Sequence, residues 1–204
     1  MFSPDREIIR FLQKDKILAS AINKVSLTIE KPVISLFEHL VASIVSQQLS
    51  TKAAKTIYTR FREGFTSQSL HPEDVLLKSP DELRNYGLSY QKASYIHNIS
   101  RYFIENNLLD NHWHKIDDDT IIKTLIPIKG VGLWTIQMIL IFHLMRDDVF
   151  PVDDLAIRNR MILWYGVEGD TKNQIHQLHQ IAEDWRPYRS WACRYIWAAG
   201  DMFT

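Results

Sequence analysis

Apolar residues recur at intervals of three and four along most of the chain, which is the spacing of helices that bury one face. In the segment 34–48, for example, Leu36, Phe37, Leu40 and Ile44 fall on one side of a helix. No long segment alternates apolar and polar residues as strands do, and no internal repeat is present. The pattern therefore predicts an all-α protein of about ten helices.

The other elements follow from the Pro, Gly and polar residues that separate the apolar runs. Residues 25–33 predict a short extended segment, and residues 106–119 predict a polar loop. Besides the helix over 34–48, we expect helices at residues 4–21, 52–62, 72–77, 80–86, 90–106, 120–125, 133–145, 154–165, 172–185 and 187–199. Helices thus account for most of the chain.

Side chains that can cap a helix N-terminus mark three of these boundaries. Ser50 or Thr51 is expected to cap the helix that begins at residue 52, and Asp119 or Thr120 the short helix that ends at residue 125. Asp153 is expected to cap the helix that follows it. In each case a side-chain oxygen would accept a hydrogen bond from a first-turn N–H that has no partner within the helix.

Two glycines bracket one apolar residue just before the helix at 133–145. Lys129 precedes Gly130, Val131 and Gly132. Glycine adopts backbone angles that other residues resist and lets another backbone approach closely. A glycine turn at a helix N-terminus also presents unpaired N–H groups, which suit an anion such as phosphate. The turn therefore indicates a phosphate-binding hairpin, although a plain corner between two helices is equally compatible with so short a motif.

A pair of carboxylates follows that helix. Pro151 and Val152 lead from a loop to Asp153, the expected N-cap of the next helix, and to Asp154, which is expected in its first turn. Both could serve only as capping groups, which is the common role of Asp at such a position. One cap needs one Asp, however, so the second carboxylate is a candidate for chemistry.

Composition limits the class of protein. The chain has 204 residues, 46% of them hydrophobic, which suffices for one sizeable core or two small lobes. It has no apolar stretch of about 18 residues, so we expect no membrane span, and its first residues lack the apolar segment of a signal peptide. Cys193 is the one cysteine, which excludes an intramolecular disulfide and fits a reducing compartment.

The distribution of charge matters more than its sum. The formal net charge is zero at pH 7, which argues mildly against nucleic-acid binding. Cations nevertheless gather in residues 52–62, before the glycines and after the carboxylates, whereas acids gather elsewhere, as in residues 117–119. A protein that grips phosphate with backbone N–H groups needs few cations, so we expect a modest positive strip on a neutral body.

The order of these features resembles that of the helix-hairpin-helix base-excision DNA glycosylases, whose signature is a hairpin, a Gly/Pro-rich loop and a catalytic Asp. The details are similar to the alkyladenine branch, that of the bacterial inducible 3-methyladenine glycosylases. The matching stretches are Ser46–Ser50, Gly130–Thr135, Val149–Leu155, and Trp185–Ser190 with Ile196 and Trp197. Each stretch alone is weak evidence, but together they are specific and span most of the chain.

The resemblance implies a two-lobed helical bundle with a helix-hairpin-helix motif. Residues 37–147 would form the lobe that contains the hairpin, and residues 1–36 with 148–204 the lobe that carries the catalytic Asp. The two lobes would make a single compact unit, with that Asp in the cleft between them. The extra N-terminal α/β domain of the bacterial enzyme is not expected, because the chain is too short to contain it.

The resemblance also implies a reaction. It assigns catalysis to Asp154 rather than Asp153, in a type II DNA-3-methyladenine glycosylase. Such an enzyme flips 3-methyladenine or 7-methylguanine out of duplex DNA and hydrolyses the N-glycosidic bond, the first step of base excision repair. The alkylated base already leaves readily, so one carboxylate beside the developing oxocarbenium sugar suffices. Bifunctional relatives have a Lys where this chain has Trp134, which implies a monofunctional enzyme without lyase activity.

Further site residues are carried over by position. Trp134 and Trp197 would stack on a cationic purine, for about 0.5–2 kcal/mol each, and Met138 would line the same pocket in place of a Tyr. Gln47 and Gln48 would enter the minor groove, with Gln48 in place of an apolar plug. The remaining DNA-binding positions are Lys129, Gly130, Val131, Gly132 and Thr135. Without the resemblance, Trp134 would be interpreted as a core residue and the glutamines as a solvated helix end.

Few ligands are expected. The resemblance implies no cofactor, although carbonyls of residues 128–132 could hold Na⁺ or K⁺, and the single cysteine excludes the iron–sulfur cluster of some relatives. His176 and His179 lack a third ligand at a suitable spacing, so we expect surface histidines. The expected partner of this monomer is double-stranded DNA with damaged bases, without a membrane, in the cytoplasm or nucleoid of a prokaryote or the nucleus of a eukaryote.

Two other functions are compatible with the sequence. A glycosylase for an oxidised, deaminated or etheno base would need a different pocket, which Met138 and Gln48 leave open. A non-catalytic helix-hairpin-helix protein would bind DNA with the Gly-Val-Gly turn and would need neither Asp154 nor Trp197.

Overall fold

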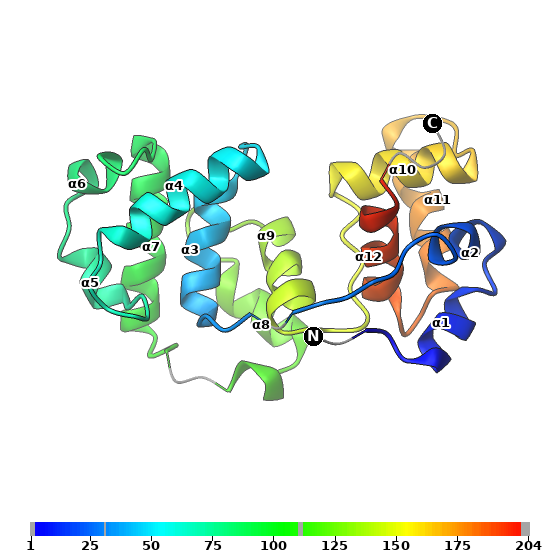
Figure 1. Ribbon diagram of the computed structural model, residues 1–204, viewed down its shortest axis with the longest axis horizontal. Helices are drawn as coiled ribbons and strands as arrows, with labels where there is room; N and C mark the ends of the chain where they lie inside the picture. Colours follow the sequence, from blue (N-terminus) through cyan, green and yellow to red (C-terminus); the bar gives the residue numbers. More distant parts are fainter. Residues whose placement is uncertain (1–2, 31, 110–111, 201–204) are drawn as a thin grey trace. The chain divides into compact units, whose positions relative to one another are not determined.

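The computed structural model describes residues 3–30, 32–109 and 112–200. Across these residues every regular element is a helix, apart from an isolated bridge residue at Ile29. The prediction of an all-α protein is therefore confirmed (Figure 1). In this part of the chain no helix is both long and apolar enough to cross a membrane.

The described residues fold into two compact units. One lies within residues 32–139, and the other combines residues from 1–31 with residues from 140–204. We name them the central unit and the terminal unit, after their places in the sequence. The predicted lobes, with boundaries at 36/37 and 147/148, begin and end slightly later in the chain.

The central unit is built around α3 (Leu36–Ser46), which packs against α4 (Thr51–Glu63) and α7 (Tyr90–Glu105). The buried rings of Phe37 and Phe103 meet at 5.4 Å and join α3 to α7. The shorter elements are α5 (Pro72–Leu76), α6 (Pro80–Arg84), η1 (Trp113–Lys115), α8 (Asp118–Leu125) and α9 (Leu133–Met138). A core of large apolar side chains thus holds α3 in the middle of the unit (Figure 1).

A buried carboxylate ties α3 to α4 and to the loop that follows α4. Glu38 is 4% exposed and accepts hydrogen bonds from the Tyr58 hydroxyl at 2.8 Å and the Leu70 N–H at 3.2 Å. It also pairs with the Arg62 guanidinium at 3.0 Å, which in turn donates to two carbonyls of the loop. Burial and the bond to Glu38 raise the pKa of Tyr58, so this hydroxyl stays protonated and keeps donating.

The terminal unit is arranged around α12 (Arg189–Ala199), which packs against α2 (Lys16–Ile22) and α10 (Leu155–Tyr165). Its remaining helices are α1 (Arg6–Leu12) and α11 (Thr171–Glu183). Trp185 and Trp191 are buried here, and Trp164 packs against the same cluster while partly buried.

One side chain explains why the predicted helix over 4–21 is two helices. Asp15 caps α2 with one carboxylate oxygen, which accepts the N–H groups of Ile17 and Leu18. Its other oxygen accepts the Tyr165 hydroxyl at 2.7 Å and the Trp185 indole N–H at 2.9 Å. These partners lie far away in sequence, so the apolar spacing of residues 4–21 could not predict the break.

Two further boundaries differ from prediction. The predicted helix over 133–145 is α9 followed by a π-helical segment, η2 (Ile139–His143), whose Ile141 carbonyl accepts a hydrogen bond from buried Arg194. The cap of α8 is Asp117, not Asp119 or Thr120, and its carboxylate accepts the N–H of Thr120 at 2.9 Å. The expected cap Ser50 is confirmed at the start of α4.

Replacing Glu38 with Ala is expected to destabilise the protein by about 3–5 kcal/mol, because it leaves the partly buried Arg62 guanidinium without its counterion and the Leu70 N–H without its acceptor. Glu38→Gln keeps hydrogen-bonding oxygen and nitrogen atoms in place and should cost less. Urea denaturation followed by circular dichroism measures both. A loss below about 1 kcal/mol for the Ala variant, within the range of a surface pair, would contradict this assignment.

Candidate functional site

The glycine turn joins α8 to α9 in the central unit. Ile128 and Val131 are buried, and the Val131 N–H donates to the Ile128 carbonyl at 2.9 Å, which closes the turn. Thr135 is also buried, whereas Lys129 and Gly132 face outward. Of the residues predicted to bind here, Val131 and Thr135 therefore shape the hairpin, and Lys129 and Gly132 are accessible to a ligand.

The two glycines of the turn meet different surroundings. Gly130 has φ +103°, and a Cβ at this position would lie 2.3 Å from the ring of Tyr95 on α7. Gly132, the N-cap of α9, has an ordinary φ of −99°, and a Cβ there would meet nothing within 4 Å. Gly130 is thus required by the fold, while Gly132 leaves open space in front of the first turn of α9.

The glutamine pair sits in the loop between α3 and α4. Gln48 has a left-handed φ of +57°, an uncommon value for a residue with a side chain. The ammonium of Lys92, on α7, donates to the carbonyls of Val45 and Gln47, both at 2.8 Å. Lys92 thereby satisfies carbonyls that α3 leaves unpaired at its C-terminus and holds the loop in place.

A cavity of about 590 Å³ joins this loop to α9. Four of the predicted site residues line it together: Gln47, Gln48, Trp134 and Met138. Trp134 is 39% exposed, so its ring forms part of the cavity wall and is not a core tryptophan. Residues about 90 positions apart in sequence are thus brought to one hollow within the central unit.

Sequence reasoning missed the rest of the cavity wall. The missed residues are His39, Ala42, Ser43, Ser46 and Leu49. Four of them recur at helical spacing on one face of α3, and three of those four are small, which leaves room for the hollow. This stripe of small residues was the available signal, but the stronger apolar stripe on the opposite face of α3 obscured it.

The second part of the predicted site lies in the terminal unit. The N-cap of α10 is Asp154, whose carboxylate oxygen Oδ1 accepts the Ile157 N–H at 3.0 Å. The same oxygen accepts the indole N–H of Trp197, on α12, at 3.0 Å. Asp153 is exposed and precedes the helix. The expectation that Asp153 caps α10 with Asp154 in the first turn is therefore wrong by one residue.

Trp197 is itself held from two sides. The guanidinium of Arg160 donates to the carbonyls of Ile196 and Trp197, both at 3.2 Å, and so ties α10 to the end of α12. The rings of Phe142 and Trp197 lie 5.2 Å apart. Next to this cluster, burial and the Asp154 carboxylate raise the pKa of Cys193. The carboxylate of Asp154 thus sits in a rigid setting of one helix terminus and one indole.

The other carboxylates near this segment have structural partners. Asp148 pairs with Arg186 at 2.8 Å and Arg189 at 2.6 Å, and Asp147 accepts the indole N–H of Trp191 at 2.7 Å. These contacts fasten the segment before α10 to the start of α12. Asp154 is also partly exposed, and two N–H groups hold its carboxylate in place.

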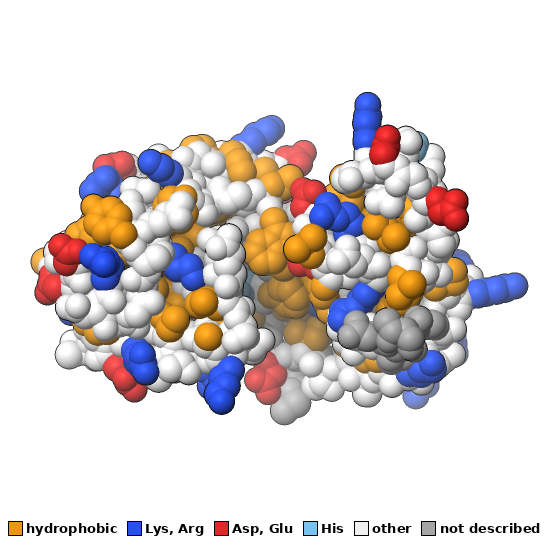
Figure 2. All heavy atoms as spheres, turned by 90° about the horizontal axis from the view of Figure 1, so that it is seen from above, with side chains coloured by type: hydrophobic (Ala, Val, Ile, Leu, Met, Phe, Trp, Pro, Cys, Tyr) orange, Lys and Arg blue, Asp and Glu red, His pale blue; other side chains and the backbone are white. Residues whose placement is uncertain are grey.

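The remaining candidates from the sequence, the histidine pair and the surface cations, form no clear binding site among the described residues. His176 and His179 are exposed, and the described residues contain no group of three or more His, Cys, Asp or Glu that could hold a metal ion. On the face drawn in Figure 2, Lys and Arg side chains lie scattered among Asp and Glu rather than gathered in one patch. On this face, a polyanion would therefore meet single cations rather than a basic patch.

The predicted site residues thus fall into two groups. The central unit holds Gln47, Gln48, Trp134, Met138 and the hairpin, and the terminal unit holds Asp154 and Trp197. Within each unit the residues meet around one feature, a cavity in the first and a capped helix in the second. Their convergence on a single site stays a prediction.

Comparison with known proteins shows which family and which solved structures the chain is similar to. The profile described as HhH-GPD superfamily base excision DNA repair protein matches residues 41–187. A crystal structure of the DNA-3-methyladenine glycosidase of Bacillus halodurans is 32% identical, with a TM-score of 0.82 over 98% of this chain and 93% of that one. The 3-methyladenine DNA glycosylase of Schizosaccharomyces pombe, solved in complex with abasic DNA, is 28% identical. Its TM-score is 0.80, and the match covers 94% of this chain and 95% of that one.

The protein YfjP of Bacillus subtilis is 29% identical over 169 residues, which are 80% of this chain and 58% of that protein. The chain therefore spans little more than half the length of this relative, but nearly the whole of the two solved structures.

Gly130→Ala is expected to destabilise the protein by about 2 kcal/mol or more, because alanine resists φ +103° and its methyl group would overlap the Tyr95 ring. Gly132→Ala is the matched control and should cost no more than about 1 kcal/mol, the range of an altered N-cap. Thermal and urea unfolding of both variants measure the contrast. Equal losses would show that the two glycines do not differ as described.

Proposed function

Because the chain belongs to the HhH-GPD superfamily of base excision DNA repair proteins, we propose that it is a DNA-3-methyladenine glycosylase. It would hydrolyse the N-glycosidic bond of alkylated purines, 3-methyladenine and 7-methylguanine, in double-stranded DNA. The names of its structural relatives support this substrate class, and the complex of one of them with abasic DNA supports DNA as the partner. The observation that carries the proposal is the fixed, partly exposed carboxylate of Asp154.

Asp154 suits the catalytic role through its charge and its support. An alkylated purine leaves with the electron pair of the bond between its nitrogen and C1′, so positive charge moves to the sugar. The carboxylate would stabilise this developing oxocarbenium ion and accept a proton from the water that adds to C1′. Two N–H donors on the same oxygen hold the carboxylate still, which is what preorganised electrostatic stabilisation requires.

The cavity of the central unit suits a flipped base. Its volume of about 590 Å³ is ample for a purine, and Trp134 offers a ring face for stacking. A cationic purine gains from such a face by a cation–π contact, worth about 0.5–2 kcal/mol. Met138 adds a polarisable sulfur to the same wall. Within the terminal unit, the indole N–H of Trp197 orients the carboxylate of Asp154.

The hairpin and the glutamine loop suit a DNA backbone and minor groove. Gly132 leaves space for a phosphate to approach the N–H groups at the start of α9, and exposed Lys129 adds one cation beside it. Gln48 is exposed at the rim of the cavity, where its side chain would fill the position of the extracted base. The hydrogen bonds from Lys92 to the Val45 and Gln47 carbonyls hold the backbone of this loop in place without DNA.

Finer features of the proposal are the type II range of substrates, the absence of lyase activity and action as a monomer. Trp134 occupies the position at which bifunctional relatives place a Lys, so no amine is available there for a Schiff base. Hairpin carbonyls of residues 128–132 would be the ligands of a monovalent cation, which takes no part in the chemical step. The protein would act where chromosomal DNA lies, in the nucleoid or the nucleus.

Asp154→Asn is expected to lower base release by about 10²–10⁴-fold while leaving the fold intact, because asparagine caps a helix as well as aspartate but carries no charge. The measurement is chromatographic detection of free 3-methyladenine and 7-methylguanine from methylated duplex DNA under single-turnover conditions. Asp153→Asn, which removes the neighbouring exposed charge, is the matched control and should release both bases at the wild-type rate.

Two results would contradict the assignment. If Asp153→Asn were slow and Asp154→Asn fast, the catalytic carboxylate would be the neighbour. If the wild-type protein bound the duplex but released nothing from methylated, deaminated or oxidised DNA, it would be a DNA-binding protein without this activity.

The wild-type protein should leave the DNA strand intact. After base release, an end-labelled duplex should be cut only when alkali is added, and borohydride should trap no protein–DNA adduct, because Trp134 cannot form a Schiff base. Denaturing gel electrophoresis measures both. Strand cleavage without alkali would assign lyase activity to a lysine elsewhere and would contradict the monofunctional mechanism.

A further inference from the structure

The wall of the cavity in the central unit carries almost no charge. Of its nine lining residues, all in the described part of the chain, His39 is the one titratable side chain. The others are serines, glutamines and apolar or aromatic residues. A cation that entered this cavity would find no carboxylate in the wall, so its binding would be sensitive to any positive charge placed there.

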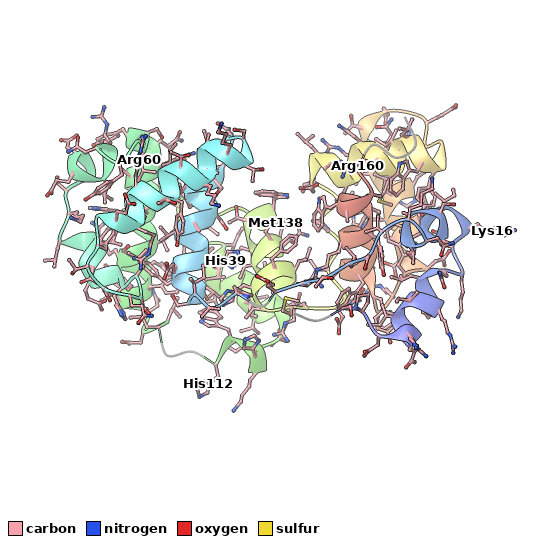
Figure 3. The ribbon with its side chains drawn as sticks, in the orientation of Figure 1. Lys16, His39, Arg60, His112, Met138 and Arg160 are labelled. Atoms are coloured by element: carbon pink, nitrogen blue, oxygen red, sulfur yellow. The ribbon has the colours of Figure 1, made fainter. Side chains whose placement is uncertain are left out.

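His39 lies where such a charge would matter. It is on α3, and Met138 on α9 lines the same hollow with it (Figure 3). Burial lowers the pKa of His39, which favours the neutral imidazole. Two charged groups on the helices packed against α3 are engaged with other partners: Arg62 on α4 pairs with Glu38, and Lys92 on α7 donates to the carbonyls of Val45 and Gln47.

We propose that His39 determines substrate charge: as a neutral side chain it admits a cationic purine to the cavity, and as a cation it rejects one. The inference rests on the proposed function, since it takes the cavity to be the base pocket. It assigns to His39 a part in specificity rather than in bond breaking. Recognition of the cation then depends on the ring of Trp134 and the sulfur of Met138, and on the absence of a competing positive charge.

The expected behaviour follows from the charge alone. In a partly dehydrated cavity, two positive charges a few ångströms apart repel by enough to change binding by about tenfold or more. Acidification should therefore weaken release of 3-methyladenine as His39 gains a proton below its ordinary pKa of 6.5. Other groups also titrate in the acid range, so the informative quantity is the difference between the wild type and a variant that lacks only the imidazole.

Two substitutions separate charge from shape. His39→Gln keeps a polar side chain of similar size without a titratable group, and His39→Lys places a permanent cation at the cavity wall. Release of 3-methyladenine from methylated duplex DNA is measured under single-turnover conditions from about pH 5.5 to 8, across the range of imidazole titration. Affinity for a duplex with a tetrahydrofuran abasic analogue is the control, since no base enters the cavity.

The Lys variant should release 3-methyladenine at least about tenfold more slowly than the wild type at every pH. The rate of release by the Gln variant should fall less at acid pH than that of the wild type, because it lacks the imidazole. Affinity of the Lys variant for the abasic duplex should be unchanged or higher, because DNA attracts an added cation. Slow release therefore cannot come from weaker DNA binding.

Release by the Lys variant at the wild-type rate would overturn the inference and leave the glycosylase function standing. Equal slowing by Gln and Lys would also overturn it, since shape rather than charge would then be responsible. Failure of the wild type to release any base would remove the proposed function and this inference together.

Discussion

The position of one carboxylate oxygen organises the part of the terminal unit that carries the candidate chemistry. Oδ1 of Asp154 accepts an N–H from the first turn of α10 and the indole N–H of Trp197 from α12. The first bond fixes where α10 begins, and the second fixes how α12 lies against it. Arg160 closes the arrangement by linking α10 back to the last turn of α12. The carboxylate proposed to act in catalysis therefore also holds α10 and α12 together.

The central unit follows a related rule, in which polar side chains fix the loops and apolar ones only fill the core. Glu38 fastens the loop after α4, and Lys92 fastens the loop before it. Tyr95 leaves room for the hairpin only because residue 130 has no side chain. Of these loops, the one between α3 and α4 lines the cavity, so the contacts of Lys92 behind it help to set the shape of the cavity wall.

Sequence periodicity was sufficient for the long helices α3 and α7, because each buries a stripe of apolar residues. It failed where a distant partner decides the backbone: Asp15 interrupts the first predicted helix through Tyr165 and Trp185. Local capping preferences could not decide between Asp153 and Asp154, since both are aspartates and either one could cap the helix. The cavity residues Gln47 and Trp134 were found through family resemblance. His39 was missed because one histidine on an apolar helix gives no signal without its neighbours in space.

The environment of Cys193 has a consequence for survival of the protein under the stress it is proposed to relieve. Agents that methylate purines are electrophiles, and among side chains they attack thiolates readily. The one thiol of this chain is fully buried, and both burial and the charge of Asp154 keep it protonated. Burial, assisted by the carboxylate that would act on the damage, therefore disfavours the thiolate form of Cys193 that such reagents attack.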